Sequence, residues 1–162
     1  MMKKMVQPSL RPTGEVSMNA YKTMRDRHQK EIDAFPMQFA FTDEQFKTGM
    51  RNLGLSPNNA DQVYRCGGTG GFYRRSDAPR FHEMFERHER ERQEAIDADT
   101  TGDGYIFDMF CCQLANHEYG YTFDLTDTLE ALDLTIEDIE KSRPLKSGLE
   151  KALAKIKKRD EE

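Results

Sequence analysis

Apolar residues recur every three or four positions along most of this chain, which is the period of amphipathic helices. Residues that favour helix starts, such as Ser, Thr and Pro, precede several of these stretches, and Gly follows some of them. The pattern therefore predicts a largely helical protein. The predicted helices cover residues 18–35, 43–53, a short stretch from 57, then 77–98, 105–118, 127–132 and 136–142, and a last stretch after Pro144.

The large apolar residues Met37, Phe39 and Phe41 alternate with Gln38 and Ala40, which is typical of a short strand. Residues 72–75 follow a glycine-rich turn at 67–71, and we expect them to form a second short strand that pairs with the first. The predicted fold class is mainly α (α+β): a compact bundle of about six to seven helices with a small two-stranded β element.

Two joints between predicted helices are similar in sequence. They read LGLSP at 53–57 and LDLTI at 132–136, so each places Gly or Asp between two leucines and is followed by Ser or Thr. We interpret both as corners at which one helix ends and the next begins.

Charge pairs are predicted along the long helix at 77–98. Glu83 lies four residues before Arg87, and Glu86 lies four residues before Arg90, which is the favourable order for ion pairs on a helix surface. We therefore expect this side of the helix to be exposed to solvent.

The length of 162 residues is typical of a single domain. We expect a disordered tail at 1–17, one globular domain over 18–158 and a frayed acidic end at 159–162. The three cysteines are odd in number and two are adjacent, which disfavours a disulfide framework and favours a reducing cytoplasm. The apolar runs are too short for a membrane span.

The distribution of charged residues along the chain says more about function than the overall composition does. Residues 93–140 contain no Lys or Arg but thirteen carboxylates. Such a segment either binds cations or faces a basic partner, and it disfavours direct binding of nucleic acid, because phosphate contacts need Lys and Arg. No nucleophile elbow, P-loop lysine or HExxH motif is present, so we expect a binding protein and not an enzyme.

The sharpest local motif is DTTGDGYI at 99–106, which matches the first eight positions of an EF-hand calcium loop. Position 12, which should be Glu, is Phe110, and a frame that starts at Asp97 places Asp108 there but displaces the apolar position. A tight turn that caps the next helix explains the same residues. The metal candidates are Asp97, Asp99, Thr101, Asp103, Tyr105 and Asp108, with calcium as the expected ion.

Zinc is a weaker candidate than calcium. The chain lacks CxxC and HxxxH spacings, and the two adjacent cysteines of a helix point in different directions. The zinc candidates would be Cys66, His82, His88, Cys111, Cys112 and His117.

Three stretches carry a resemblance to known proteins: FPMQFAFTDEQFKTGMRNLGL at 35–55, GGFYRRSD at 70–77 and DTTGDGYIFDMFCCQLANHEYGYTFDLTDTLEALDLT at 99–135. Together they resemble a group of small proteins from phages and mobile elements of gut bacteria, over roughly residues 18–142. The run LANHEY at 114–119 is the most distinctive piece. The resemblance implies a type II-A anti-CRISPR inhibitor and carries over no catalytic residues.

The expected function follows from this resemblance and from the acidic segment together. We expect a phage-type anti-CRISPR protein of the bacterial host cytoplasm that binds a type II RNA-guided Cas nuclease and blocks target DNA binding or cleavage. The alternative is a metal-binding phage accessory protein that binds another host protein. The carboxylates expected to meet basic side chains of the partner are Asp124, Asp127, Glu130, Asp133, Glu137, Asp138 and Glu140.

Overall fold

The computed structural model describes residues 19–160, with the side chain of Asp160 excepted. These residues form helices α1 to α8 and one small antiparallel sheet, which confirms the predicted mainly-α class with some β structure. The contacts divide the described residues into two units, 28–92 and 19–27 with 93–160, and each is taken by itself below. The predicted tail at 1–17 lies outside the described residues, and one domain over 18–158 stays a prediction.

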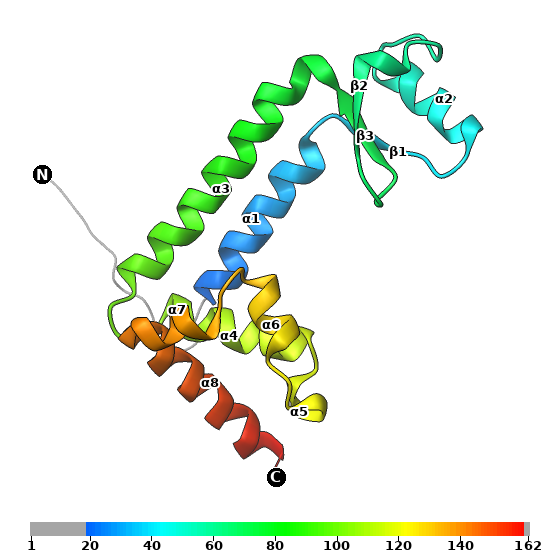
Figure 1. Ribbon diagram of the computed structural model, residues 1–162. Helices are drawn as coiled ribbons and strands as arrows, with labels where there is room; N and C mark the ends of the chain where they lie inside the picture. The colour runs from blue at the N-terminus through cyan, green and yellow to red at the C-terminus, as the bar shows by residue number, and fades with distance from the viewer. Residues whose placement is uncertain (1–18, 161–162) are drawn as a thin grey trace, which may run out of the picture. The chain divides into compact units, whose positions relative to one another are not determined.

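Helix boundaries agree with the sequence periodicity in most places (Figure 1). The helix from residue 57 is the exception, because a short 3-10 turn at Ala60–Gln62 stands near that place. The helices are α1 Ala20–Ala34, α2 Asp43–Asn52, α3 Ala78–Ala98, α4 Tyr105–Asn116, α5 Tyr119–Thr122, α6 Thr126–Ala131, α7 Ile136–Lys141 and α8 Arg143–Asp160.

The sheet of residues 28–92 has three strands instead of the predicted two. They are β1 Met37–Phe39, β2 Val63–Cys66 and β3 Gly71–Arg74, in the order β1-β3-β2 with antiparallel pairing throughout. The expected pairing of the first strand with the strand at 72–75 is confirmed, since β1 pairs with β3. The strand that the sequence pattern missed is β2, whose Val and Tyr favour a strand although only four residues form it.

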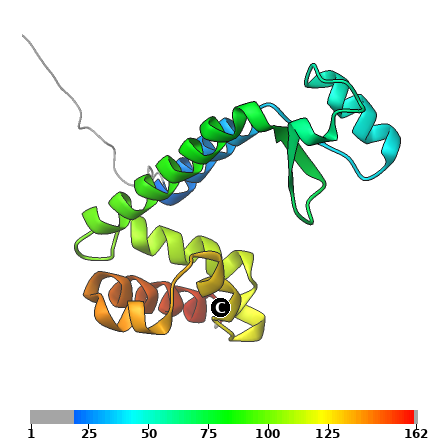
Figure 2. The same ribbon diagram turned by 45° about the horizontal axis from the view of Figure 1, so that its top comes forward.

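One face of this sheet packs against α2 (Figures 1 and 2). Met50 of α2 and Leu53, the residue that caps the end of α2, pack with Val63 and Phe72 of the strands, and all four side chains are buried. Gly49 allows the close contact, because a Cβ atom there would stand 2.6 Å from the ring of Phe72. The α2–sheet packing therefore forms the small apolar core of this unit.

The core of the other unit is centred on α4. Ile106, Phe110 and Leu114 of α4 repeat at helical spacing with no exposed surface, and Ala152 of α8 is equally buried. Helices α6, α7 and α8 contribute Leu129, Ile139 and Leu149, among others, to the same cluster. Burial of this many apolar side chains supplies the main stabilising free energy of the unit.

The two similar joints end their helices in the same way. After α2, the N–H of Leu55 donates to the carbonyl of Met50, and Gly54 adopts a positive φ of 78°. After α6, the N–H of Leu134 donates to the carbonyl of Leu129, and Asp133 adopts a positive φ of 55°. Both are Schellman caps, and Asp replaces the usual Gly in the second. The second joint leads into α7 as predicted, whereas the first leads into the 3-10 turn and β2.

None of the helices in the described part of the chain combines the length and the apolar character that a membrane crossing requires. Helix α8 continues to Asp160, two residues into the end that was expected to fray, and residues 161–162 lie outside the described part.

Candidate functional site

The seven carboxylates predicted to bind a partner lie on or next to α6 and α7, and every one of their side chains is exposed. Residues 124–140, which we call the acidic segment, contain these seven carboxylates and no Lys or Arg. The predicted binding residues are therefore accessible to a partner. They lie on short helices that are anchored to the core by the buried Leu129 and Ile139.

Four of the seven carboxylates already have partners. Asp124 accepts the backbone N–H of Thr126, and Asp138 completes a capping box with Thr135 at the start of α7. These hydrogen bonds lower the pKa of both carboxyl groups. Glu137 and Glu140 form exposed ion pairs, at 3.3 Å with Lys141 and at 3.4 Å with Lys146.

The other three carboxylates are uncommitted. Within residues 19–160, the side chains of Asp127, Glu130 and Asp133 have no hydrogen bond or ion pair. Ile136, at the start of α7, is 55% exposed and adds an apolar side chain to the surface of the segment. Protein interfaces commonly combine a small apolar centre with a polar rim. The exposed apolar side chain and the free charges around it provide these two parts.

The EF-hand-like loop is organised by Asp99. Its carboxylate accepts the backbone N–H groups of Gly102, Gly104 and Ile106 at 2.9, 3.1 and 2.9 Å. Burial acts to raise the pKa of this carboxyl group, but the backbone hydrogen bonds outweigh it and lower the pKa. Asp99 therefore closes the loop and satisfies N–H groups at the start of α4, as the turn interpretation predicts.

The other calcium candidates each have a separate partner. Asp97 accepts from Gln93 on the same helix, and Thr101 accepts the N–H of Asp103. The Asp103 carboxylate forms an ion pair with Lys151 of α8, while Asp108 accepts the N–H of Ala20 at the start of α1. Tyr105 is buried, with its ring edge-on to Tyr21 at 5.5 Å.

These contacts do not gather the candidate ligands around one point. Among the described residues, no group of three or more His, Cys, Asp or Glu side chains is arranged to hold a metal ion. The zinc candidate His88 binds Glu31, and burial raises the pKa of the Cys111 thiol. Calcium and zinc binding stay predictions.

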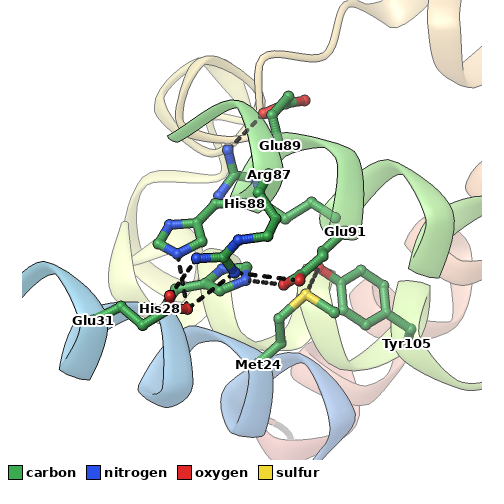
Figure 3. A network of polar contacts seen from close by, with 9 residues as sticks. Met24, His28, Glu31, Arg87, His88, Glu89, Glu91 and Tyr105 are labelled. Atoms are coloured by element: carbon green, nitrogen blue, oxygen red, sulfur yellow. Dashed lines mark hydrogen bonds and ion pairs between the residues drawn. The ribbon is translucent and has the colours of Figure 1, made fainter. Parts of the chain in front are cut away.

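A second polar constellation lies between α1 and α3 and was not predicted (Figure 3). His28 and His88 are both buried, and their rings stack with centroids 3.8 Å apart and an interplanar angle of 17°. Each ring binds a carboxylate of the opposite helix: His28 Nε2 lies 2.7 Å from Glu91 and His88 Nε2 lies 3.1 Å from Glu31. The arrangement is reciprocal, so each helix supplies one ring and one carboxylate.

Arg87 joins the two carboxylates. Its guanidinium donates hydrogen bonds to Glu31 and also to Glu91, so one cation balances the charge of both acids. These hydrogen bonds lower the pKa of Glu31 to about 2, while burial lowers the pKa of His88. The predicted solvent-exposed pair of Glu83 with Arg87 was wrong, because Arg87 instead turns towards α1.

A short signal for this constellation was present in the sequence. The pattern His-x-x-Glu occurs at 28–31 and again at 88–91, which places one imidazole and one carboxylate on the same side of each helix. Helical periodicity does not distinguish these residues from ordinary positions on an amphipathic helix, so it did not predict the constellation.

The comparisons with known proteins give one match. A family model described as a family of unknown function, DUF7659, matches residues 20–155. No curated protein matches the chain. No solved structure matches it.

Proposed function

We propose that this chain, which belongs to the DUF7659 family of unknown function, is a protein-binding inhibitor that presents its acidic segment to a basic partner. The observation that carries the proposal is the set of uncommitted carboxylates Asp127, Glu130 and Asp133 on exposed short helices. The resemblance to small phage proteins indicates the partner class, a type II RNA-guided nuclease. The carboxylates of the acidic segment form ion pairs with basic side chains of that partner.

The charge of the segment is matched to such a partner. An RNA-guided nuclease holds its guide–target duplex in a positively charged channel lined by Lys and Arg. The acidic segment carries seven carboxylates, and Lys141 and Lys146 beyond its end offset only two of them, so its field attracts these side chains at a distance. Occupation of the channel excludes the target DNA, which needs the same cations for its phosphates.

The structure around the segment favours recognition by a rigid surface. Leu129 of α6 and Ile139 of α7 are buried in the core cluster, and the cap at Asp133 and the capping box at Thr135 fix the helix ends. A surface held by core packing loses little conformational entropy when it binds. The four partnered carboxylates add negative potential while the three uncommitted ones are available for direct ion pairs.

The proposal is tested with purified full-length protein and a type II-A nuclease, with and without guide RNA. We expect stoichiometric association, loss of target DNA binding when the inhibitor is in excess, and no catalytic turnover. An association constant that falls as salt rises supports ion pairing. If the two proteins do not associate at low salt, with or without guide RNA, the proposed partner is wrong.

A further inference from the structure

An apolar groove lies between α5 and α8. It has a volume of about 570 Å³, which is room for several apolar side chains. Its apolar walls come from the short helix and from the C-terminal half of α8. The side chains in question are Tyr119, Phe123, Leu153, Ala154 and Ile156.

The backbone beside the groove is unusual. Helix α5 stands between Glu118 and Phe123, which both adopt left-handed conformations with φ of 54°. This conformation is rare for an aromatic residue and is maintained only where the surroundings impose it. The Phe123 ring is 70% exposed and stands edge-on to Tyr119 at 5.9 Å.

Two charged residues mark the ends of the groove along α8. Glu150 and Lys157 line it together with the apolar side chains and are seven residues apart. Seven residues span about 10 Å of helix and return to nearly the same face. Within the described residues, neither side chain has an ion-pair partner, so both charges are available.

This order of charges is complementary to itself. If a second α8 lies antiparallel to the first across a two-fold axis that passes between Leu153 and Ala154, Glu150 of each copy faces Lys157 of the other. A closed two-fold interface requires such a self-complementary patch. The small side chain of Ala154 near the axis permits close approach of the two helices.

We propose that the groove binds α8 of a second copy of this chain and that the protein forms an antiparallel, two-fold symmetric dimer. The apolar ridge of each α8 then covers the Phe123 ring of the other copy, and two ion pairs between Glu150 and Lys157 fix the direction of the helices. The dimer does not rest on the proposed inhibitor function, because it uses none of the carboxylates of the acidic segment.

The test is sedimentation equilibrium of the full-length protein over a wide range of concentration. The wild type shows a monomer–dimer equilibrium. Glu150→Lys and Lys157→Glu each replace both ion pairs of the dimer by contacts between like charges, and each weakens the dimer at least about tenfold. Lys158→Glu makes the same charge change as Lys157→Glu outside the groove lining, and it leaves the dimer within about twofold of the wild type.

The decisive experiment restores opposite charges across the interface by combining the two charge variants. A mixture of the Glu150→Lys and Lys157→Glu proteins forms a heterodimer, and the double variant regains the wild-type dimer. Phe123→Asn, which suits the left-handed conformation but removes the ring, weakens the dimer and keeps the fold. A wild type that stays monomeric at every concentration, or single variants that dimerise as well as the wild type, overturns the proposal, as does a mixture of the two variants that fails to associate.

Discussion

The imidazole rings of His28 and His88 stack face to face with their centroids 3.8 Å apart, and each ring binds a carboxylate of the opposite helix. A proton on the buried His88 ring adds a positive charge to a site that already holds Arg87, although Glu31 and Glu91 offset part of it. This relationship makes the packing of α1 on α3 sensitive to pH.

Acidification below neutral pH is expected to destabilise the protein through His88. Burial lowers the pKa of its imidazole below the unfolded value of 6.5, so the unfolded chain binds the proton more readily. The free energy of unfolding is therefore highest above about pH 6.5 and falls as the pH drops through that value. Urea denaturation at pH 7.5 and at pH 5.5 measures the difference.

The matched variants for that experiment are His88→Gln and His82→Gln. His82 is exposed, so its replacement should leave the pH dependence unchanged. Replacement of His88 should reduce the dependence between pH 7.5 and pH 5.5. An unchanged pH dependence in the His88→Gln protein would show that another group is responsible.

Glu31→Gln is expected to lower the free energy of unfolding at pH 7 by about 1–3 kcal/mol, because it removes the charged acceptor of Arg87 and of His88. The pKa of Glu31 in the folded protein is about 2, below the unfolded value of 4.5. Its stabilising contribution is thus present above pH 4.5 and is lost as the pH falls towards 2.

Glu89→Gln is the control, since Glu89 lies on α3 too but forms an exposed pair with Arg92. That change should cost no more than about 0.5 kcal/mol. Chemical denaturation of both proteins at pH 7 gives the comparison. Equal losses in the two variants would mean that the network contributes no more than an ordinary surface pair.

Gly102→Ala is expected to destabilise the protein by about 2–4 kcal/mol. Gly102 has a φ of 85°, and a Cβ atom there would stand 2.2 Å from the carbonyl oxygen of Pro144. The control is Gly54→Ala, with a φ of 78° and no atom within 4 Å of the added carbon, which should cost only about 1 kcal/mol. Similar losses of stability in the two variants would mean that the positive φ causes the destabilisation, and not the contact with Pro144 of α8.

Asp99→Ala separates the two interpretations of the loop at 99–106. If Asp99 mainly caps the loop, the variant loses the acceptor of three backbone N–H groups and melts at a lower temperature in EDTA as well as in calcium. We expect this result. A wild type whose melting temperature rises with calcium, together with a variant that differs from it only when calcium is present, would favour a calcium site.

The sequence predicted those elements that depend only on residues close together in the chain. The helical period around Ile106 and Phe110 involves residues only a few positions apart in the chain, and so does each leucine joint. The structure contains both features. The exposure of Asp127 and Glu130 follows from their charge, since carboxylates are rarely buried without a partner.

What the sequence did not show depends on partners far apart in the chain. The four residues of β2 form a strand because β3 pairs with them, and Arg87 turns inward because Glu31 stands on another helix. The left-handed backbone at Phe123 has no sequence signal at all, since Phe seldom adopts it. The groove beside α8 is lined by Phe123 together with residues of α8, which lie far apart in the chain.

The central claim is that the uncommitted carboxylates of the acidic segment bind a basic partner. Its most direct test compares nuclease affinity between two variants with equal charge changes, at one low salt concentration. The first carries Asp127→Lys, Glu130→Lys and Asp133→Asn, where Asn keeps the left-handed backbone of the cap. The second carries Glu83→Lys, Glu86→Lys and Glu94→Gln, at exposed positions outside the segment.

Melting temperatures near that of the wild type establish that both variants fold. The account predicts that the first variant binds the nuclease at least about a hundredfold more weakly than the wild type, because several ion pairs are lost or become repulsive, while the second stays within about threefold. Equal affinities for the two variants would contradict the claim that the acidic segment is the binding surface.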